Sequence, residues 1–340
     1  MTGALQRALL LAWTRRGPLA TLLLPLASVY GLLARLRRLL YRLGILRTQR
    51  VPVPLVVVGN LVAGGAGKTP VVMELVTHLA AKGWTPGVVS RGYGRKGAAC
   101  REVHNDSPVA EVGDEPLLIR RKTGVPVFVA ARRHTAALQL LARYPAVDIL
   151  VSDDGLQHLA LHRDIEICVF DERGVGNGWL LPAGPLREPW PRHCDFILDA
   201  GALPATQRFT IRRKLADHAR KANGQSVPLD ALARRADGLA TTLWAVAGIA
   251  RPETFFAMLR SRSLLLAGTT ALPDHGTPQE RDLQVTAGHL LLCTEKDAAK
   301  IWPLQPEALA VVLQLDIEPA FWSAFEQRLA AGKSAAGKSA

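Results

Sequence analysis

A glycine-rich stretch near the start of the chain has the residue types and spacing of a phosphate-binding loop. It reads GNLVAGGAGKT over residues 59–69, between a β-like apolar run at 54–58 and a helix-like pattern at 70–82. Backbone N–H groups of such a loop, with the N-terminus of the following helix, attract phosphate oxygens. Lys68 would reach the β- and γ-phosphates as a catalytic cation, and the Thr69 hydroxyl would ligate Mg²⁺. The residues expected to bind ATP are Ala63, Gly64, Gly65, Ala66, Gly67, Lys68 and Thr69.

The context of this loop matters more than its Gly-Lys-Thr triplet. The strict pattern has glycine where this chain has Val62, and the Gly64-Gly65 pair could compensate. Gly-Lys-Ser occurs twice more in the low-complexity tail at 330–340, but no apolar strand precedes either copy. We therefore predict a nucleotide site only at 59–69, where strand, loop and helix patterns follow one another.

Two acidic clusters could supply metal ligands and a catalytic base. Asp153 and Asp154 follow the apolar run 148–152, and an acid at a strand end beside a phosphate loop suits Mg²⁺. We predict both as metal residues, although a helix N-cap would also explain one of them. Asp114 and Glu115 precede a helical pattern, where helix capping and general-base catalysis are both consistent with the spacing.

A basic loop, SRGYGR at 90–95, follows another short apolar run. It matches the glycine spacing of a dinucleotide-binding loop, but no apolar helix opens there. We predict that Arg91, Tyr93 and Arg95 contact phosphate or substrate, with a solvated turn as the alternative. Asn60, at the start of the glycine-rich loop, is predicted on the substrate side as well.

The first fifty residues carry nine arginines and no acidic residue, so +9 of the net charge of +13 lies there. Within them, residues 17–34 are uncharged and have arginines on both sides. Eighteen helical residues span about 27 Å, just short of the ~30 Å hydrocarbon core. We predict a membrane anchor, either a short or tilted spanning helix or a surface-lying amphipathic segment. A buried helical hairpin is the alternative.

The rest of the chain excludes some classes of protein. Its remaining charge of only +4 argues against a nucleic-acid-binding fold. None of the four cysteines forms a Cys-x-x-Cys pair, which argues against a zinc site or a disulfide framework.

Short apolar runs, at 54–58, 87–90, 125–130, 148–152, 165–170 and 196–199, alternate with helical patterns. This alternation predicts an α/β fold with a P-loop NTPase-like, mostly parallel sheet. We expect a membrane-anchoring helix at 1–45, a nucleotide-binding core at 46–205 and a linker or small hairpin at 206–242. A second, smaller α/β domain would occupy 243–329, beginning with an apolar run at 243–249 and a helix near 252–262. The tail at 330–340 is of low complexity.

Several stretches together resemble the lipid A tetraacyldisaccharide 4′-kinase family of Gram-negative bacteria. They occur in the family's order over about 240 residues, and the basic apolar N-terminus is similar to the family's membrane anchor. The stretches are GNLVAGGAGKTP (59–70), SRGYGR (90–95), VGDEP (112–116), SDDGLQH (152–158), LPAGPLREP (181–189), AVAGIARPETFF (245–256), PDH (273–275) and TEKD (294–297).

The resemblance implies ATP-dependent phosphorylation of the 4′-hydroxyl of an acylated glucosamine disaccharide 1-phosphate. It implies Asp114 as general base acting with His275, otherwise a lone loop histidine, and Asp274 as a group that orients it. It also implies Arg187 and Glu188 near ATP and Mg²⁺, beside Lys68, Thr69 and the Asp153–Asp154 pair. The family commonly has Thr where this chain has Ala66, and a second His where it has Gly276.

The resemblance further implies a place on the cytoplasmic face of the inner membrane, among inner-membrane lipids. We expect a monomer that binds no nucleic acid. The competing class is a membrane-associated P-loop GTPase or ATPase switch without a small-molecule acceptor. Thr294-Glu295-Lys296-Asp297 has the ends of a guanine-recognition stretch, but Glu295 occupies the position of its lysine, which weakens that alternative.

Overall fold

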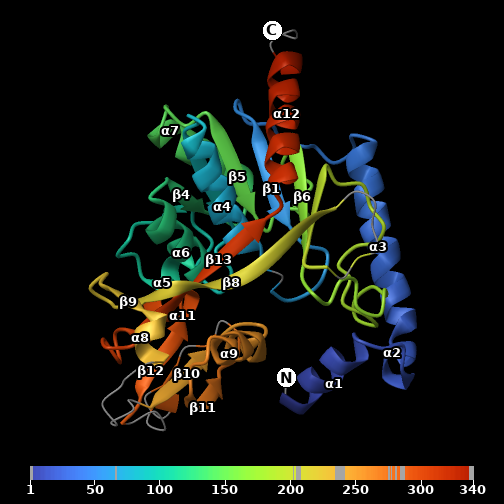
Figure 1. Ribbon diagram of the computed structural model, residues 1–340. Coiled ribbons are helices and arrows are strands. Elements are labelled where there is room, and N and C mark those ends of the chain that lie inside the picture. The colour runs from blue at the N-terminus through green and yellow to red at the C-terminus, as the bar shows by residue number, and fades with distance from the viewer. Residues whose placement is uncertain are drawn as a thin grey trace.

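The strands form one mixed sheet that joins two α/β units (Figure 1). The computed structural model describes residues 3–65, 67–201, 203, 208–233, 242–274, 276, 278–279, 282–283 and 288–336. Ala66 and His275, both predicted site residues, lie outside the described residues. The strands are β1 (Leu55–Gly59), β2 (Pro86–Ser90), β3 (Arg101–Glu102), β4 (Val127–Val129), β5 (Ile149–Asp153), β6 (Ile165–Phe170), β7 (Phe196–Asp199), β8 (Phe209–Arg220), β9 (Ser226–Pro228), β10 (Leu243–Ala247), β11 (Leu266–Ala271), β12 (Leu290–Thr294) and β13 (Leu309–Ile317).

The helices cover both faces of this sheet or lie at its edges. They are α1 (Gly3–Ala12), α2 (Pro18–Leu22), α3 (Leu24–Arg42), α4 (Lys68–Ala81), α5 (Val109–Val112), α6 (Asp114–Thr123), α7 (Arg133–Arg143), α8 (Leu229–Ala233), α9 (Pro252–Ser261), α11 (Glu295–Ile301) and α12 (Pro319–Ala336). The strand order is β11-β10-β12-β13-β8-β7-β6-β1-β5-β2-β4-β3, and β9 pairs with β8.

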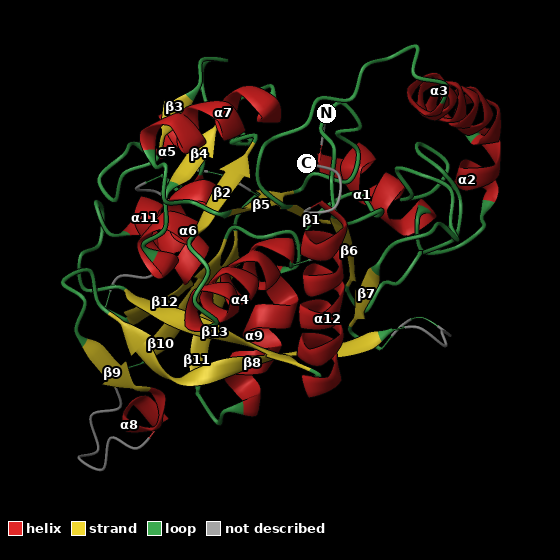
Figure 2. Cartoon of the chain, turned by 90° about the horizontal axis from the view of Figure 1, so that it is seen from above, coloured by secondary structure: helices red, strands yellow, loops and turns green. Residues whose placement is uncertain are grey.

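The N-terminal unit is built on the neighbouring parallel strands β4, β2, β5, β1, β6 and β7, and a mostly parallel sheet is what the sequence predicts. Successive side chains of β1 point to opposite faces of the sheet. Val56 and Val58 pack with α4, α6 and α12, whereas Leu55 and Val57 pack with α7 and the loops after β5. Figure 2 shows α4 and α12 side by side, and Glu326 of α12 joins them by pairing with His78 and Lys82 of α4. The apolar face of β1 and its neighbours thus fixes where the glycine-rich loop begins.

The C-terminal unit repeats this arrangement on a smaller scale. Its strands β11, β10, β12 and β13 pair parallel to one another. Phe255, Phe256 and Leu259 of α9 pack on one face of these strands, and Ala298 and Ile301 of α11 pack on the other.

Two long strands carry the sheet from one unit to the other. β8 pairs parallel with β7 and antiparallel with β13, so the β8–β13 ribbon runs between the units (Figure 1). The segment predicted as a linker or hairpin, 206–242, contains β8 and β9, which pair antiparallel. Because β8 and β13 span the junction, they supply side chains to the space between the units.

The N-terminal arm lies along one side of the core (Figures 1 and 2). Within the described residues no helix combines the length and the apolar character needed to cross a bilayer. The uncharged run 17–34 is divided between α2 and α3. The Tyr30 hydroxyl of α3 donates to the Arg187 carbonyl oxygen at 2.8 Å, and Arg38 forms an ion pair with Glu188. The arm is therefore attached to a segment that the sequence predicts to be part of the site.

Candidate active site

The glycine-rich loop leaves β1 and enters α4, and its shape is held from inside. The fully buried Asn60 donates through Nδ2 to the carbonyl oxygens of Val62 at 2.6 Å and Gly64 at 3.3 Å. Its Oδ1 accepts a hydrogen bond from Lys68 Nζ at 3.1 Å. Gly64 and Gly67 have φ of 92° and 73°, values that favour glycine, whereas φ at Val62 is not positive. The loop thus has its glycines where the backbone needs them, and valine fits at position 62.

The carboxylate of Asp153 lies at the end of the strand next to this loop. β1 and β5 are adjacent and parallel, with Val58 and Asp153 in register. Asp153 is buried and its Oδ1 has no hydrogen-bond partner among the described residues. Burial, together with the nearby Glu115 and Asp154 carboxylates, raises the pKa of Asp153 to about 7. A buried carboxylate oxygen without a partner fits a hard cation such as Mg²⁺. The Thr69 hydroxyl at the start of α4 is another oxygen ligand that the sequence predicts.

Asp154 has a different environment from its neighbour. Its Oδ1 lies 3.4 Å from Lys68 Nζ and 3.3 Å from Arg187 Nη1. Burial raises the pKa of Asp154, but Lys68, Arg187 and Arg133 outweigh that effect and lower it overall. Asp154 therefore orients cations at the loop, while Asp153 offers the oxygen suited to a metal.

Three polar residues at this edge received no role from the sequence. The buried Arg133 donates through Nη2 to the Asp154 carbonyl oxygen at 2.6 Å, and Gln157 donates to the Asn60 carbonyl oxygen at 3.1 Å. Burial and nearby arginines lower the pKa of His158 to about 4, so it is neutral at pH 7. Position could have identified them, because Arg133 follows β4 and the other two follow β5.

Asp114 begins α6 and is almost fully buried, at 4% exposed. Its Oδ1 accepts the Glu115 backbone N–H at 2.9 Å, and its Oδ2 accepts Lys300 Nζ at 2.9 Å. Lys300 comes from α11 in the C-terminal unit, so the contact joins the two units. Asp274, which precedes His275, pairs with Lys296 of the same helix at 3.2 Å. Asp114 and the residue before His275 thus both contact lysines of α11.

The basic loop at 90–95 packs against the turn before Asp114. A Cβ atom at Gly113 would lie 3.1 Å from the Tyr93 carbonyl oxygen, so the two backbones touch closely. Arg91 and Tyr93 are exposed, and Arg95 is half-buried. The loop therefore presents its cationic and aromatic side chains beside the turn that leads into Asp114.

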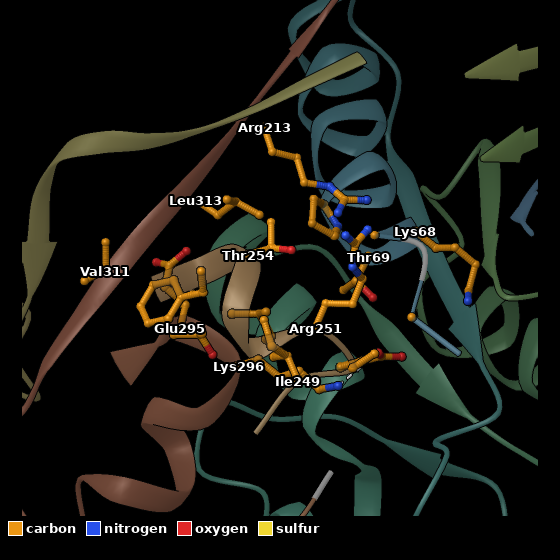
Figure 3. A pocket seen from close by; sticks show the side chains of 18 of the residues that line it. Lys68, Thr69, Arg213, Ile249, Arg251, Thr254, Glu295, Lys296, Val311 and Leu313 are labelled. Carbon is orange, nitrogen blue, oxygen red and sulfur yellow. Dashed lines mark ion pairs between the residues drawn. The ribbon is translucent and has the colours of Figure 1, made fainter. Parts of the chain in front are cut away.

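A cavity extends from the glycine-rich loop into the junction between the units (Figure 3). Gly65, Gly67, Lys68 and Thr69 line one end of it. Arg213 of β8 extends toward that end, and a Cβ atom at Gly67 would lie 2.2 Å from its Nη2 atom. The remaining wall is largely apolar: Leu215, Ile249, Phe255, Met258, Val311 and Leu313. The polar end can take phosphates and the apolar end a flat ring.

Arg187 and Glu188 lie close in sequence but have different partners. Arg187 faces Asp154, and its backbone N–H donates to the Leu61 carbonyl oxygen at 2.7 Å. Glu188 is buried and pairs with Arg38 and Arg192. Arg187 thus borders the phosphate loop, whereas Glu188 connects the core to α3.

Known proteins match this chain over nearly its whole length. A family model described as tetraacyldisaccharide-1-P 4′-kinase matches residues 19–332. A tetraacyldisaccharide 4′-kinase of Acidovorax sp. (strain JS42) is 56% identical over 327 residues, covering 94% of this chain and 93% of that protein. One from Polaromonas naphthalenivorans (strain CJ2) is 56% identical over 330 residues, covering 95% and 94%.

A solved structure matches as well. It is the crystal structure of the "apo" form of LpxK from Aquifex aeolicus in complex with ATP, with a TM-score of 0.77 and 27% identity. The match covers 92% of this chain and 99% of that one. The family model and the relatives show that this chain belongs to the tetraacyldisaccharide-1-P 4′-kinase family.

Proposed function

We propose that this protein transfers the γ-phosphoryl group of ATP to the 4′-hydroxyl of an acylated glucosamine disaccharide 1-phosphate. The register of Val58 with Asp153 carries the proposal. It brings the phosphate loop and a buried carboxylate oxygen without a partner to one edge of the sheet, in a chain of this family. Phosphoryl transfer requires mainly positioning and charge stabilisation, which such an edge supplies.

The nucleotide would occupy the cavity between the units. Its phosphates would meet the loop from Ala63 to Thr69, with Lys68 and Arg213 as cations. Its purine would lie among the apolar side chains of β8, β13 and α9. Thr69 and Asp153 would hold Mg²⁺, which neutralises charge on the β- and γ-phosphates when bound.

The acceptor would approach from the other side of the loop. Asp114 would take the proton of the sugar hydroxyl, assisted by His275. Arg91, Tyr93 and Arg95 would contact the substrate from their loop. We propose that the buried Asn60 contributes by holding Lys68, since its amide is engaged within the loop.

A measurement of ADP release tests this function. Release should rise strongly when the acylated disaccharide 1-phosphate is added in mixed micelles. Equal release with and without the acceptor would favour an ATPase or switch instead.

We further propose that α3 lies on the inner membrane's cytoplasmic face. Leu26, Val29, Leu33 and Leu36 recur at helical spacing along α3 and are between 47% and 60% exposed. Arginines of the same arm could meet lipid phosphates. The contacts of Tyr30 and Arg38 with 187–188 would then hold the site next to the lipid surface.

Replacing Leu26 and Leu33 together by glutamate should weaken binding to anionic phospholipid vesicles by at least about tenfold, because each buried leucine contributes about 1.5–3 kcal/mol. Co-sedimentation with the vesicles measures this. The matched control is Leu138→Glu on α7, where Leu138 is 45% exposed. Unchanged sedimentation of the double variant would place the membrane contact elsewhere.

A further inference from the structure

Two lysines of α11 reach across the junction to two consecutive carboxylates at the start of α6. Lys300 Nζ lies 2.9 Å from Asp114 Oδ2, and Lys296 Nζ lies 3.5 Å from Glu115 Oε1. Residues four apart in a helix share one face, so one face of α11 serves both pairs. The Lys300–Asp114 pair is buried, with side chains 6% and 3% exposed. The two residues are 186 apart in sequence. Because either charge alone would be costly to bury, the pair favours the one arrangement of α11 and α6 in which both charges meet.

The rest of the TEKD stretch attaches α11 to the nucleotide cavity. Thr294 caps the helix by accepting the Asp297 N–H at 3.2 Å. Asp297 Oδ2 accepts the Gly248 backbone N–H at 2.9 Å, and Gly248 precedes cavity-lining Ile249 and Arg251. Glu295 forms an ion pair with Lys122 of α6. One short helix therefore contacts the cavity wall at one end and Asp114 along its side.

We propose that Lys300 is a positioning residue for phosphoryl transfer, one that holds the Asp114 carboxylate ionised and aimed at the acceptor hydroxyl. The inference rests on the role proposed above for Asp114. The sugar hydroxyl passes its proton to Asp114 while the hydroxyl oxygen forms a bond to the γ-phosphorus. The bond between the γ-phosphorus and the bridging oxygen of ADP breaks, and Lys300 keeps its own protons. Because Lys300 belongs to the C-terminal unit, the base is held only while that unit sits against α6.

The charges around Asp114 set the expected pH dependence. Lys300 and Lys296 face it from α11, Glu115 lies on its own helix, and Asp274 lies on the loop after β11. Without the Lys300 cation, the two other carboxylates would weigh more heavily, and Asp114 would bind a proton at higher pH. The acidic limb of the pH–kcat profile should then shift to higher pH.

Kinase assays on Lys300→Met and Lys300→Arg test the proposal. Lys300→Met should lower kcat on the order of 10- to 100-fold, since small misplacement of a catalytic group can cost 10²-fold, with KM for ATP within about threefold. Its acidic limb should shift to higher pH. Lys300→Arg should recover most of kcat and the original limb. The matched control is Lys82→Met, which removes an exposed lysine of the N-terminal unit paired with Glu326 at 3.0 Å.

Other results would overturn the inference. A Lys300→Met enzyme that unfolds at the wild-type temperature and keeps its kcat and pH limb shows that the lysine does not position the base. An increase in kcat would show that the pair restrains Asp114. If Lys300→Met does not fold, Lys300→Gln decides, because it keeps a hydrogen-bond donor for Asp114 without the charge. The proposal then predicts an acidic limb at higher pH, whereas a purely structural lysine leaves that limb in place. Full activity of Asp114→Asn would instead refute the base itself, which separates the two failures.

Discussion

Replacing Asp114 by asparagine should reduce kcat by about 10²- to 10⁴-fold, the range that general-base catalysis contributes, with nearly unchanged affinity for ATP. Asparagine keeps the shape of the side chain and can still accept the Glu115 N–H, but it cannot accept a proton at neutral pH. Asp114 does not line the nucleotide cavity, which is why ATP binding should be spared. Steady-state kinetics and calorimetric titration with ATP measure the two quantities.

The Lys300–Asp114 pair complicates this variant and also provides its control. Asparagine leaves Lys300 as a buried cation without its carboxylate, and breaking a buried pair costs about 3–5 kcal/mol. The double variant Asp114→Asn/Lys300→Met removes both charges. If the loss came only from the stranded lysine, the double variant would regain turnover; if Asp114 is the base, it stays inactive. Recovery would contradict the mechanism.

Lys68→Met should reduce kcat by a comparable factor, but through the ATP phosphates instead of the acceptor hydroxyl. Lys68 is 8% exposed and connects Asn60 Oδ1 to Asp154 at the phosphate loop. Methionine retains the length but removes the charge that would stabilise the transferring phosphoryl group. We expect kcat to fall by about 10²- to 10³-fold, the cost of losing one preorganised donor in a buried site. Unlike Asp114→Asn, this variant should also bind ATP more weakly.

The matched control lies at the other end of the same helix. Lys82 is paired with Glu326 at 3.0 Å, and its side chain is 52% exposed. Lys82→Met should keep normal kinetics, because exposed pairs contribute little. Equal kinetics of Lys68→Met and wild type would show that the loop does not act on phosphate.

The sequence predicted the elements whose signal is local. Strands β1, β2, β4, β5, β6 and β7 coincide with short β-branched runs, since a strand buried on both faces is apolar throughout. The phosphate loop and the Asp153–Asp154 strand end were found for the same reason: each follows such a run. A membrane-spanning helix was one of the two forms of anchor predicted for the arm. In the described part of the chain, no helix has the length and apolar character that this form requires.

Contacts between distant segments gave no such signal. β8 is rich in charged residues, which is typical of a linker or hairpin, and its long antiparallel partner β13 lies far along the chain. Arg213 therefore went unnoticed, although it approaches the phosphate loop. Nothing in the local sequence distinguishes Lys300 from an ordinary helix cation, since its contact with Asp114 arises only where α11 packs against α6. Its importance depends on packing that no periodicity encodes.

Identification of the product tests the central claim most directly. ATP labelled in its γ-phosphate is incubated with the protein and the acylated disaccharide 1-phosphate, and the lipid product is analysed by phosphorus–proton correlation NMR. We predict that the label appears as a phosphate monoester on the 4′-oxygen of the distal glucosamine, and that Asp114→Asn forms about 10²- to 10⁴-fold less of this product in the same time. Label found only as inorganic phosphate, or on a different hydroxyl, would contradict the proposed function.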